Sequence, residues 1–198
     1  SEENILNKKI AFVGDYDSTN IALSMISRNE DSFVFDIDKK LLAFFENTAK
    51  TNSYKVNTVH CDIFKYKYPK YNKKFDIIVS DPPYAMGGIK KFIEFGISLL
   101  KDEGIGFLAV PYHENILLTE QILFEVTKLL VENNCLITDN KKNFYYYLGA
   151  DNLKSSMIRF KKIKNNHPID ISKLYSYKEK NVNRPIVIYK DMDGDGIF

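Results

Sequence analysis

Short apolar runs alternate with amphipathic stretches along the first two-thirds of the chain. The first run, Lys9–Gly14, is flanked by polar residues and ends in glycine, which is typical of a strand buried on both faces. Similar runs follow at Ser32–Asp36, Asn57–Cys61, Phe75–Ser80 and Ile105–Val110. Apolar residues recur at helical spacing over Thr19–Ser27, Lys39–Lys50, Ile89–Leu100 and Leu117–Asn133. This alternation predicts right-handed crossovers, and therefore a parallel sheet with helices on both faces.

The remainder of the chain has a different pattern. Strand-like composition is found in three further segments, Cys135–Thr138, Tyr145–Leu148 and Ser155–Lys162. They predict an antiparallel C-terminal edge, which many doubly wound sheets have. Residues 1–164 are therefore expected to form one α/β domain with a doubly wound, mostly parallel sheet. Residues 165–198 are expected to form a polar extension with one edge-strand pattern, Pro185–Tyr189, and a frayed tail.

Composition narrows the class of protein. The 198 residues are 44% hydrophobic, which is enough for a core, and 28 Lys and Arg against 26 Asp and Glu leave a net charge of only +2. With Arg28, Arg159 and Arg184 as its only arginines, the chain is a poor candidate for base reading. It has no apolar run of ~20 residues and no signal-peptide pattern. Cys61 and Cys135 suit reduced core thiols. A cytoplasmic protein that binds neither nucleic acid nor membrane is expected.

Acidic residues follow the predicted strands, at the edge where a doubly wound sheet binds its ligand. These ends carry Gly14, Asp15 and Asp17 after the first strand, Asp36 and Ile37 after the second, Asp62 after the third and Asp81 after the fourth. A carboxylate at Asp36 can accept both ribose hydroxyls of an adenosine, with Ile37 against the adenine and Asp62 on its amino group. The alternative is that each acid caps the helix that follows. The combination on three consecutive strands favours nucleoside binding.

The first loop indicates which nucleoside. It lacks the repeated glycines of a phosphate cradle, and Asp15 and Asp17 stand where a pyrophosphate would need backbone amides. A dinucleotide is therefore disfavoured, and the two carboxylates suit a cationic or zwitterionic tail. S-adenosylmethionine or its decarboxylated form has both an adenosine for Asp36 and a positively charged tail for Asp15 and Asp17. No metal is expected.

The sharpest motif is Asp81–Tyr84, with the sequence Asp-Pro-Pro-Tyr. Two prolines directly after a strand fix φ and remove two N–H donors, so the loop is rigid and its carbonyls stay available. Asp81 and the Pro82 carbonyl can accept hydrogen bonds from an amine, and Tyr84 can stack on the group that carries it. A proline turn with a helix-capping Asp is the structural alternative. The chemistry implied is attack of a neutral amine on a carbon bonded to sulfonium.

These features resemble the class I S-adenosylmethionine-dependent transferase fold, a Rossmann-like methyltransferase fold. Adenine amino-methyltransferases carry the same Asp-Pro-Pro-Tyr, but Val13–Thr19 looks like the Gly-Asp-Asp-Asp-x-Thr loop of the branched-chain polyamine synthases, the bis(aminopropyl)spermidine synthase family. That family is also resembled by Phe35–Asp38, Phe75-Asp76, Gly96–Leu100 and Lys154–Arg159. The resemblance covers roughly residues 9–162.

The resemblance implies an aminopropyltransferase of polyamine biosynthesis, with decarboxylated S-adenosylmethionine as donor and a polyamine nitrogen as acceptor. It implies that Asp81 receives or orients the amine and that Asp15 and Asp17 line the cleft. Two departures concern the acceptor: Tyr16 stands at the position of the middle acid of the loop, and the catalytic domain is expected to start almost at residue 1, without the winged-helix domain of the family. Transfer of a 3-amino-3-carboxypropyl group, or use of another amine acceptor, therefore stays open.

Two rival functions remain. One is methyl transfer to adenine or a small molecule; the other is a non-catalytic nucleoside-binding subunit, which the intact Asp36, Asp62 and Asp81 argue against. The predicted catalytic residues are Asp81, Tyr84 and Asp17. The predicted donor-binding residues are Gly14, Asp15, Asp17, Asp36, Ile37, Asp62 and Asp81, and those for the acceptor are Pro82, Tyr84, His113 and Glu114. The aromatic cluster Asn143–Tyr147 is a further candidate for the acceptor pocket, since aromatic faces bind ammonium groups. A homodimer is compatible with the sequence.

Overall fold

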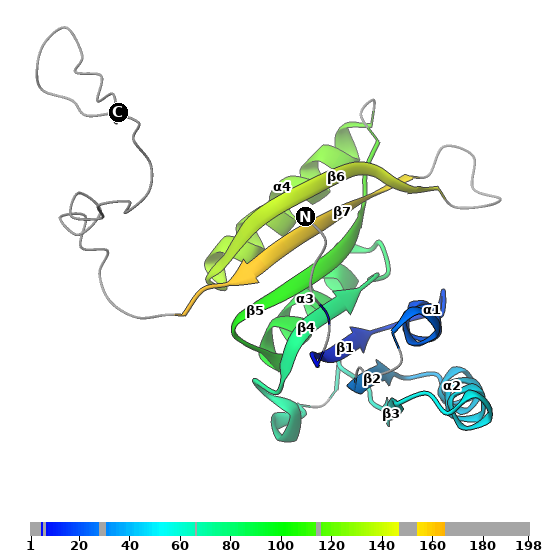
Figure 1. The fold of residues 1–198 in the computed structure, drawn as a ribbon. Coiled ribbons are helices and arrows are strands. Elements are labelled where there is room, and N and C mark those ends of the chain that lie inside the picture. Colours follow the sequence, from blue (N-terminus) through cyan, green and yellow to red (C-terminus); the bar gives the residue numbers. More distant parts are fainter. Residues whose placement is uncertain are drawn as a thin grey trace, which may run out of the picture. The chain divides into compact units, whose positions relative to one another are not determined.

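The structure, a computed structural model, describes residues 5, 7–27, 31–65, 67–113, 116–146 and 154–164. These residues form a seven-stranded sheet in the order β3-β2-β1-β4-β5-β7-β6 (Figure 1). Its parallel strands are β1 (Lys9–Val13), β2 (Asp31–Asp36), β3 (Val56–His60), β4 (Phe75–Ser80) and β5 (Leu100–Pro111). The antiparallel strands β7 (Lys154–Lys162) and β6 (Cys135–Tyr146) complete the edge. The predicted α/β fold, doubly wound with an antiparallel C-terminal edge, is confirmed.

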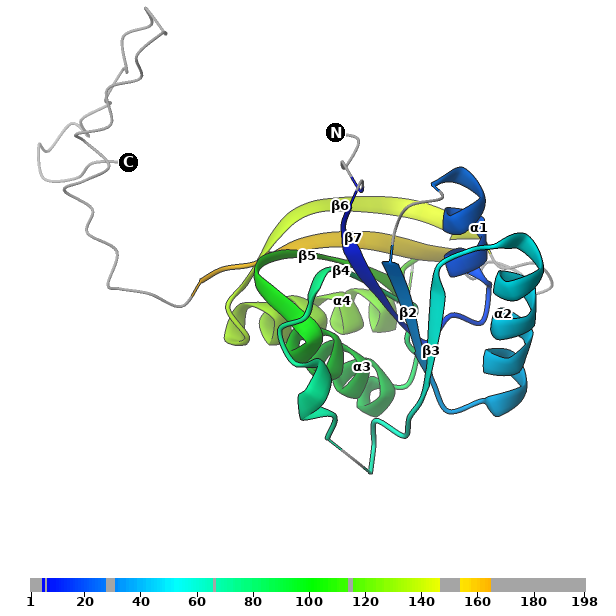
Figure 2. The same ribbon diagram turned by 60° about the horizontal axis from the view of Figure 1, so that its bottom comes forward.

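Helices pack on both faces of the sheet (Figure 2). One face carries α1 (Thr19–Ile26) and α2 (Lys39–Asn52), and the other carries α3 (Met86–Leu99) and α4 (Leu117–Glu132). A short 3-10 helix, Pro69–Tyr71, precedes β4. No helix in the described part of the chain is long and apolar enough to span a membrane. The sequence predictions for residues 165–198, including a strand at Pro185–Tyr189, lie outside the described residues.

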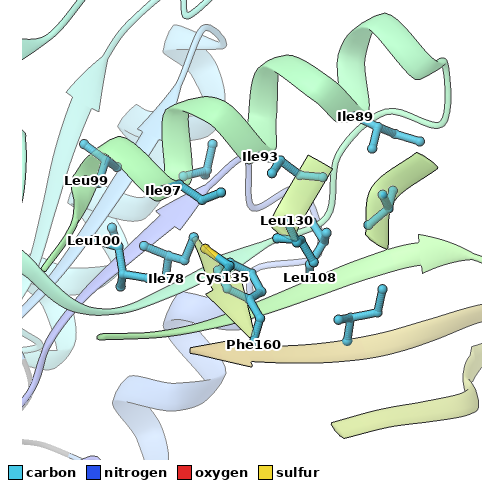
Figure 3. Packing of buried hydrophobic residues seen from close by; sticks show 14 of the residues in the cluster. Ile78, Ile89, Ile93, Ile97, Leu99, Leu100, Leu108, Leu130, Cys135 and Phe160 are labelled. Carbon is cyan, nitrogen blue, oxygen red and sulfur yellow. The ribbon is translucent and has the colours of Figure 1, made fainter. Parts of the chain in front are cut away.

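The larger hydrophobic core lies between the sheet and the helices α3 and α4. Along α3, Ile89, Ile93 and Ile97 recur every fourth residue, so they share one face of the helix. Figure 3 shows this face directed toward the strands, where it meets Leu108 and Phe160. Full burial of each such side chain contributes roughly 1.5–3 kcal/mol relative to exposure. This core fixes the strands whose ends carry the candidate site.

Both cysteines are core residues, as the sequence predicts. Cys61 and Cys135 are buried and not disulfide-bonded. Burial raises the pKa of the Cys61 thiol to about 12, with the carboxylates of Asp36 and Asp62 adding to the shift. Burial also raises the pKa of Cys135, to about 11. Because the thiolate is the reactive form, neither side chain suits nucleophilic chemistry near neutral pH.

Three element boundaries differ from the sequence prediction. The gap expected between the helix ending at Leu100 and the strand starting at Ile105 lies inside β5, which begins at Leu100; the register shifts there, and Glu103 has a φ of 66°. The two strands expected over residues 135–148 form one strand, β6, with two register shifts. Bulges absorb extra residues without ending a strand, so turn-like residues inside a strand mislead a pattern analysis. Helix α3 also begins at Met86, ahead of the expected start at Ile89.

The two faces of the sheet are covered to different extents. On one face, α3 contacts β1, β4 and β5, and α4 contacts β5 and β6. On the other face, α2 packs against β2 and β3, and α1 packs against α2 (Figure 2). Among the described residues, no helix packs over β5, β7 and β6 on that second face. The side chains of Phe107, Met157 and Arg159 instead border a cavity there.

Candidate functional site

Gly14 directly follows β1, one of the inner strands of the sheet. Its φ of 66° lies in the left-handed region, which glycine adopts without strain. A Cβ atom at this position would lie 2.9 Å from the Phe92 ring and 3.9 Å from the backbone oxygen of Asp81. The glycine therefore allows the loop after β1 to approach the loop after β4, which brings the predicted donor and acceptor residues together.

Asp15 and Asp17 follow Gly14 but lie in different environments. Asp15 is 3% exposed, and its carboxylate accepts hydrogen bonds from the N–H and side-chain amide of Asn20 and from the N–H of Thr19. It therefore caps α1, whose N-cap residue makes no side-chain bond. Burial raises the pKa of Asp15 to about 7, although the bonds from Asn20 oppose the shift. Asp17 is exposed and accepts a 3.0 Å hydrogen bond from the Thr19 hydroxyl.

Asp36 stands at the end of β2, beside a cavity of about 120 Å³. The cavity is also lined by Ile37, Cys61, Asp62, Phe64 and Phe92. Helix α2 is capped by Asp38, which accepts the N–H groups of Lys40 and Leu41. The Oδ1 atom of Asp36 accepts the Asp38 N–H at 2.8 Å, ahead of the first turn of α2. Helix capping therefore does not account for Asp36.

Asp62 lies across the same small cavity, after β3. Its Oδ1 accepts the Phe64 N–H at 3.0 Å, and its Oδ2 lies 3.3 Å from the Lys65 ammonium. Desolvation favours the neutral acid, but the hydrogen bonds from Lys65 and Phe64 outweigh it and hold the pKa of Asp62 below its usual value. The side chain is thus a carboxylate at neutral pH and can accept from an amino group. The Phe64 N–H and the Lys65 ammonium already contact its two oxygens, so they would compete with the amino group of a ligand.

The Asp-Pro-Pro-Tyr loop leaves β4 and enters α3. Asp81 is exposed, Pro82 is buried and Tyr84 is half-buried. A Cβ on Gly88 would lie 2.7 Å from the Pro83 ring, so the first turn of α3 packs directly against the loop. A second cavity, of about 390 Å³, is lined by Gly14, Asp15, Asp36, Asp81, Pro82 and Tyr84. Packing and the two rings make this loop a rigid edge of that cavity.

A third cavity, of about 560 Å³, opens on the uncovered face. Its lining includes Asp15, Asp17, Asp81, Ala109, Lys141, Phe144, Met157 and Arg159. Gly14 lines all three cavities, Asp36 joins the first to the second, and Asp81 joins the second to the third. The three cavities therefore form a row from β3 to β6, which begins at the carboxyl ends of the parallel strands and continues over the uncovered face of β5, β7 and β6. Among the described residues, no group of His, Cys, Asp or Glu is arranged to hold a metal ion.

The structure brings most of the predicted site residues to this row of cavities. Two predicted acceptor residues are exceptions: His113 is outside the three linings, and Glu114 lies outside the described residues. The His113 backbone instead bonds to the Thr119 hydroxyl at the entry to α4. Of the aromatic cluster at residues 143–147, Phe144 lines the third cavity, whereas the side chains of residues 145–147 are outside the described set.

The sequence interpretation missed the wall of the third cavity. Its residues Lys141, Met157 and Arg159 come from β6 and β7. Phe92 of α3, which lines the two smaller cavities, was also missed. Ser155, Met157 and Arg159 alternate along β7, so a period of two was the available signal. That signal does not indicate which face of the sheet at β7 is left uncovered, because this depends on where helices from other parts of the chain pack.

Comparisons with known proteins agree on one family. A family model described as the branched-chain polyamine synthase A C-terminal domain matches residues 2–191. An N(4)-bis(aminopropyl)spermidine synthase of Methanocaldococcus jannaschii is 32% identical over 152 residues, 75% of this chain and 43% of that protein. An uncharacterized protein of the same organism is 29% identical over 180 residues, 89% of this chain and 45% of that protein. The chain thus spans less than half the length of these relatives.

Solved structures share the fold. The branched-chain polyamine synthase of Thermus thermophilus, solved with N4-aminopropylspermidine and 5'-methylthioadenosine, has a TM-score of 0.69 and 18% identity, over 81% of this chain and 53% of that one. A Methanosarcina mazei protein described as an S-adenosylmethionine-dependent methyltransferase has a TM-score of 0.63 and 13% identity, over 79% of this chain and 93% of that one. At these identities the likeness establishes the class I methyltransferase-like fold alone.

Proposed function

The chain belongs to the branched-chain polyamine synthase A C-terminal domain family, and from this membership we propose that it transfers an aminopropyl group from decarboxylated S-adenosylmethionine to an amine. The names of the relatives indicate polyamines as the acceptor class. The observation that carries the proposal is the row of three cavities, which share Gly14 and of which the second and third also share Asp81. Donor and acceptor can enter from opposite ends and meet at that point, which holds the reacting atoms close together.

The nucleoside of the donor would occupy the two smaller cavities. The Asp36 carboxylate would accept the ribose hydroxyls, because it stands at the end of β2 and leaves the capping of α2 to Asp38. Ile37 and Phe92 offer apolar surface for the adenine, and the Asp62 carboxylate can accept from its amino group. Together these groups would recognise an adenosine without any phosphate.

The loop after β1 favours the decarboxylated donor. A carboxylate on the donor tail would need N–H groups or a cation, and the N-terminus of a helix is the usual source. Here the N–H groups of Thr19 and Asn20 already bond to Asp15, and those of Ile21 and Ala22 bond to the Ser18 oxygen. The exposed Asp17 would attract the ammonium that both donors carry.

The proposed reaction needs positioning more than acid–base power. The lone pair of the neutral acceptor nitrogen forms a bond to the carbon next to sulfonium, and the electrons of the broken C–S bond go to sulfur. The products are the alkylated amine, methylthioadenosine and one proton, which Asp81 or water takes. Asp81 and the Pro82 carbonyl would align the amine, and Tyr84 would pack against it, all on one rigid loop.

The nature of the released nucleoside tests the proposal. Purified protein is incubated with each donor and a panel of amines, and nucleosides and products are identified by mass. Methylthioadenosine with an acceptor heavier by an aminopropyl group supports the proposal. A gain of 3-amino-3-carboxypropyl identifies the intact donor, and S-adenosylhomocysteine identifies methyl transfer, which the methyltransferase-like fold also accommodates.

A variant links the transfer to Asp81. Asp81→Asn keeps the shape of the side chain and removes its charge, so donor binding should persist while turnover falls at least ~100-fold. Asp102→Asn, in the bulge of β5 at the opposite edge of the sheet, is the matched control. Normal turnover of the Asp81 variant would leave this residue with a structural role only.

A further inference from the structure

The third cavity has two ends of opposite charge. Asp17 and Asp81 stand at the end near β1 and β4, and Lys141 and Arg159 stand at the end formed by β6 and β7. The two basic residues share one face, since Lys141 pairs with Met157, and Arg159 lies two residues further along the same strand. One carboxylate, that of Asp139, also lines the basic end, opposite Arg159. The basic end therefore carries two positive charges and one negative charge.

An apolar floor joins the two ends. Across three neighbouring strands, Ala109 of β5 pairs with Met157 of β7, which pairs with Lys141 of β6. On the β4 side, Ser80 pairs with Leu108, and Asp81 is the next residue after Ser80. Asp81 therefore stands at the head of this row, about 14 Å from Lys141 in backbone position at ~4.8 Å per strand. The aliphatic stem of a ligand can lie over Ala109 and Met157 with a polar group at each end.

The basic end contains groups suited to an anion. Arg159 is the only arginine among the described residues of a lysine-rich chain, and its planar guanidinium matches a carboxylate with paired N–H groups. A hydrogen bond to the Thr138 hydroxyl orients that guanidinium. Ser155, four residues before Arg159 on β7 and 1% exposed, lines the same cavity, and its hydroxyl has no hydrogen-bond partner among the described residues. A buried hydroxyl without a partner is costly unless a ligand or water bonds to it.

We propose that the wall formed by Lys141 and Arg159 selects amine acceptors whose far end is an anion, such as a carboxylate, over acceptors whose far end is an ammonium group. The inference rests on the proposed function for the amine end, which Asp81 would receive. It concerns the opposite end of the same molecule. In a partly enclosed cavity, the positive charges of Lys141 and Arg159 would repel an ammonium group at the far end of the acceptor and attract an anionic group there.

This selection would separate the chain from an enzyme for linear polyamines. A polyamine that reached from Asp81 across the floor would place an ammonium group against the basic wall. The Lys154–Arg159 run resembles the polyamine synthase family, so Arg159 alone does not distinguish the two acceptors. Lys141, from the neighbouring strand, adds the second positive charge that makes a cationic far end unfavourable.

Three acceptors that share an amine and a five-carbon chain test the inference. They are 5-aminopentanoate, pentylamine and 1,5-diaminopentane, which differ only in a negative, neutral or positive far end. Their affinities for the full chain saturated with methylthioadenosine are measured by calorimetry, and turnover is measured with the decarboxylated donor. The carboxylate should bind at least ~10-fold more tightly than the diamine, with pentylamine between them.

Variants assign the preference to the wall. Lys141→Met and Arg159→Lys should each reduce the ratio of affinities, and the combination of Lys141→Met with Arg159→Met should remove it. Lys142→Met is the matched control, because Lys142 stacks on the Tyr112 ring and does not line the cavity. A diamine that binds as tightly as the carboxylate would overturn the inference, and so would an unchanged ratio in the double variant. Binding that follows the expected order without turnover would overturn the proposed function and leave the wall supported.

Discussion

The two halves of the row of cavities, the donor half and the acceptor half, are built in different ways. On the donor half, the carboxylates lie at the end of a parallel strand or in the loop directly after it, and Asp15, Asp38 and Asp62 all accept backbone N–H groups. On the acceptor half, Lys141 and Arg159 come from neighbouring antiparallel strands, where Lys141 pairs with Met157 and Arg159 lies two residues beyond Met157, on a part of the sheet that no described helix covers. Main-chain bonds fix the first set, whereas strand register fixes the second.

This difference indicates how each half can vary. A carboxylate that caps a helix cannot be exchanged without a cost in stability. A side chain on an open strand face contacts few neighbours, so it can change with little effect on folding. We therefore expect substitutions on the donor half to affect stability and donor binding together, and substitutions on the acceptor half to affect acceptor choice alone.

The largest expected effect is on stability and concerns Asp15. Its pKa is about 7 in the folded protein, against a usual value of 3.8. Between these values the folded state keeps a proton that the unfolded state releases, so the free energy of unfolding falls as pH rises from about 4 to 7. A difference of about three pKa units limits this decrease in the free energy of unfolding to ~4 kcal/mol. Urea unfolding of the wild type and of Asp15→Asn at pH 5 and pH 8 measures the change.

The Asp15→Asn variant should have a flatter pH dependence, because an amide oxygen still accepts the Asn20 N–H and carries no charge. Asp139→Asn is the control from the acceptor half; Asp139 is exposed and bonds to the adjacent N–H of Asn140. A flat profile for the wild type, or an equal change in the Asp139 variant, would remove the proposed contrast in stability between the two halves.

The same contrast explains what the sequence could predict. Asp36, Asp62 and Asp81 each follow a compact apolar run, so local pattern and the rule for doubly wound sheets were enough to place them. Asp15 was expected to face the donor, but its bonds to Asn20 depend on how the loop closes on α1. Arg159 could not be assigned to the site, because bulges in β6 set its register and the coverage of the sheet decides which face is open.

The second expected effect is on donor affinity. Asp36→Ala should weaken binding of methylthioadenosine by about 1.5–3 kcal/mol, the usual value of a charge-assisted hydrogen bond. Asp31→Ala, at the other end of β2, is the matched control, since Asp31 is exposed, lines none of the three cavities and contacts the Asn57 side-chain amide and Lys9. Calorimetry measures both, and the ratio of acceptor affinities should not change. An unaltered donor affinity would exclude Asp36 from the ribose site.

The smallest expected effect lies where the two halves meet, at Asp17. This carboxylate lines the third cavity and not the two smaller ones, yet it is exposed and close to the point where a donor tail would emerge. If it holds the donor ammonium, the decarboxylated donor should bind more tightly than S-adenosylmethionine, whose additional carboxylate it repels. In a partly solvated cleft one such charge contributes on the order of 1 kcal/mol, or roughly fivefold in affinity.

Asp17→Asn should reduce this preference and leave the affinity for methylthioadenosine, which has no tail, unchanged. A competition titration of the two donors against wild type and variant decides the question. Equal or tighter binding of the intact donor by the wild type would turn the assignment toward 3-amino-3-carboxypropyl or methyl transfer. A variant that keeps its donor preference but binds amine acceptors more weakly would place Asp17 on the acceptor half.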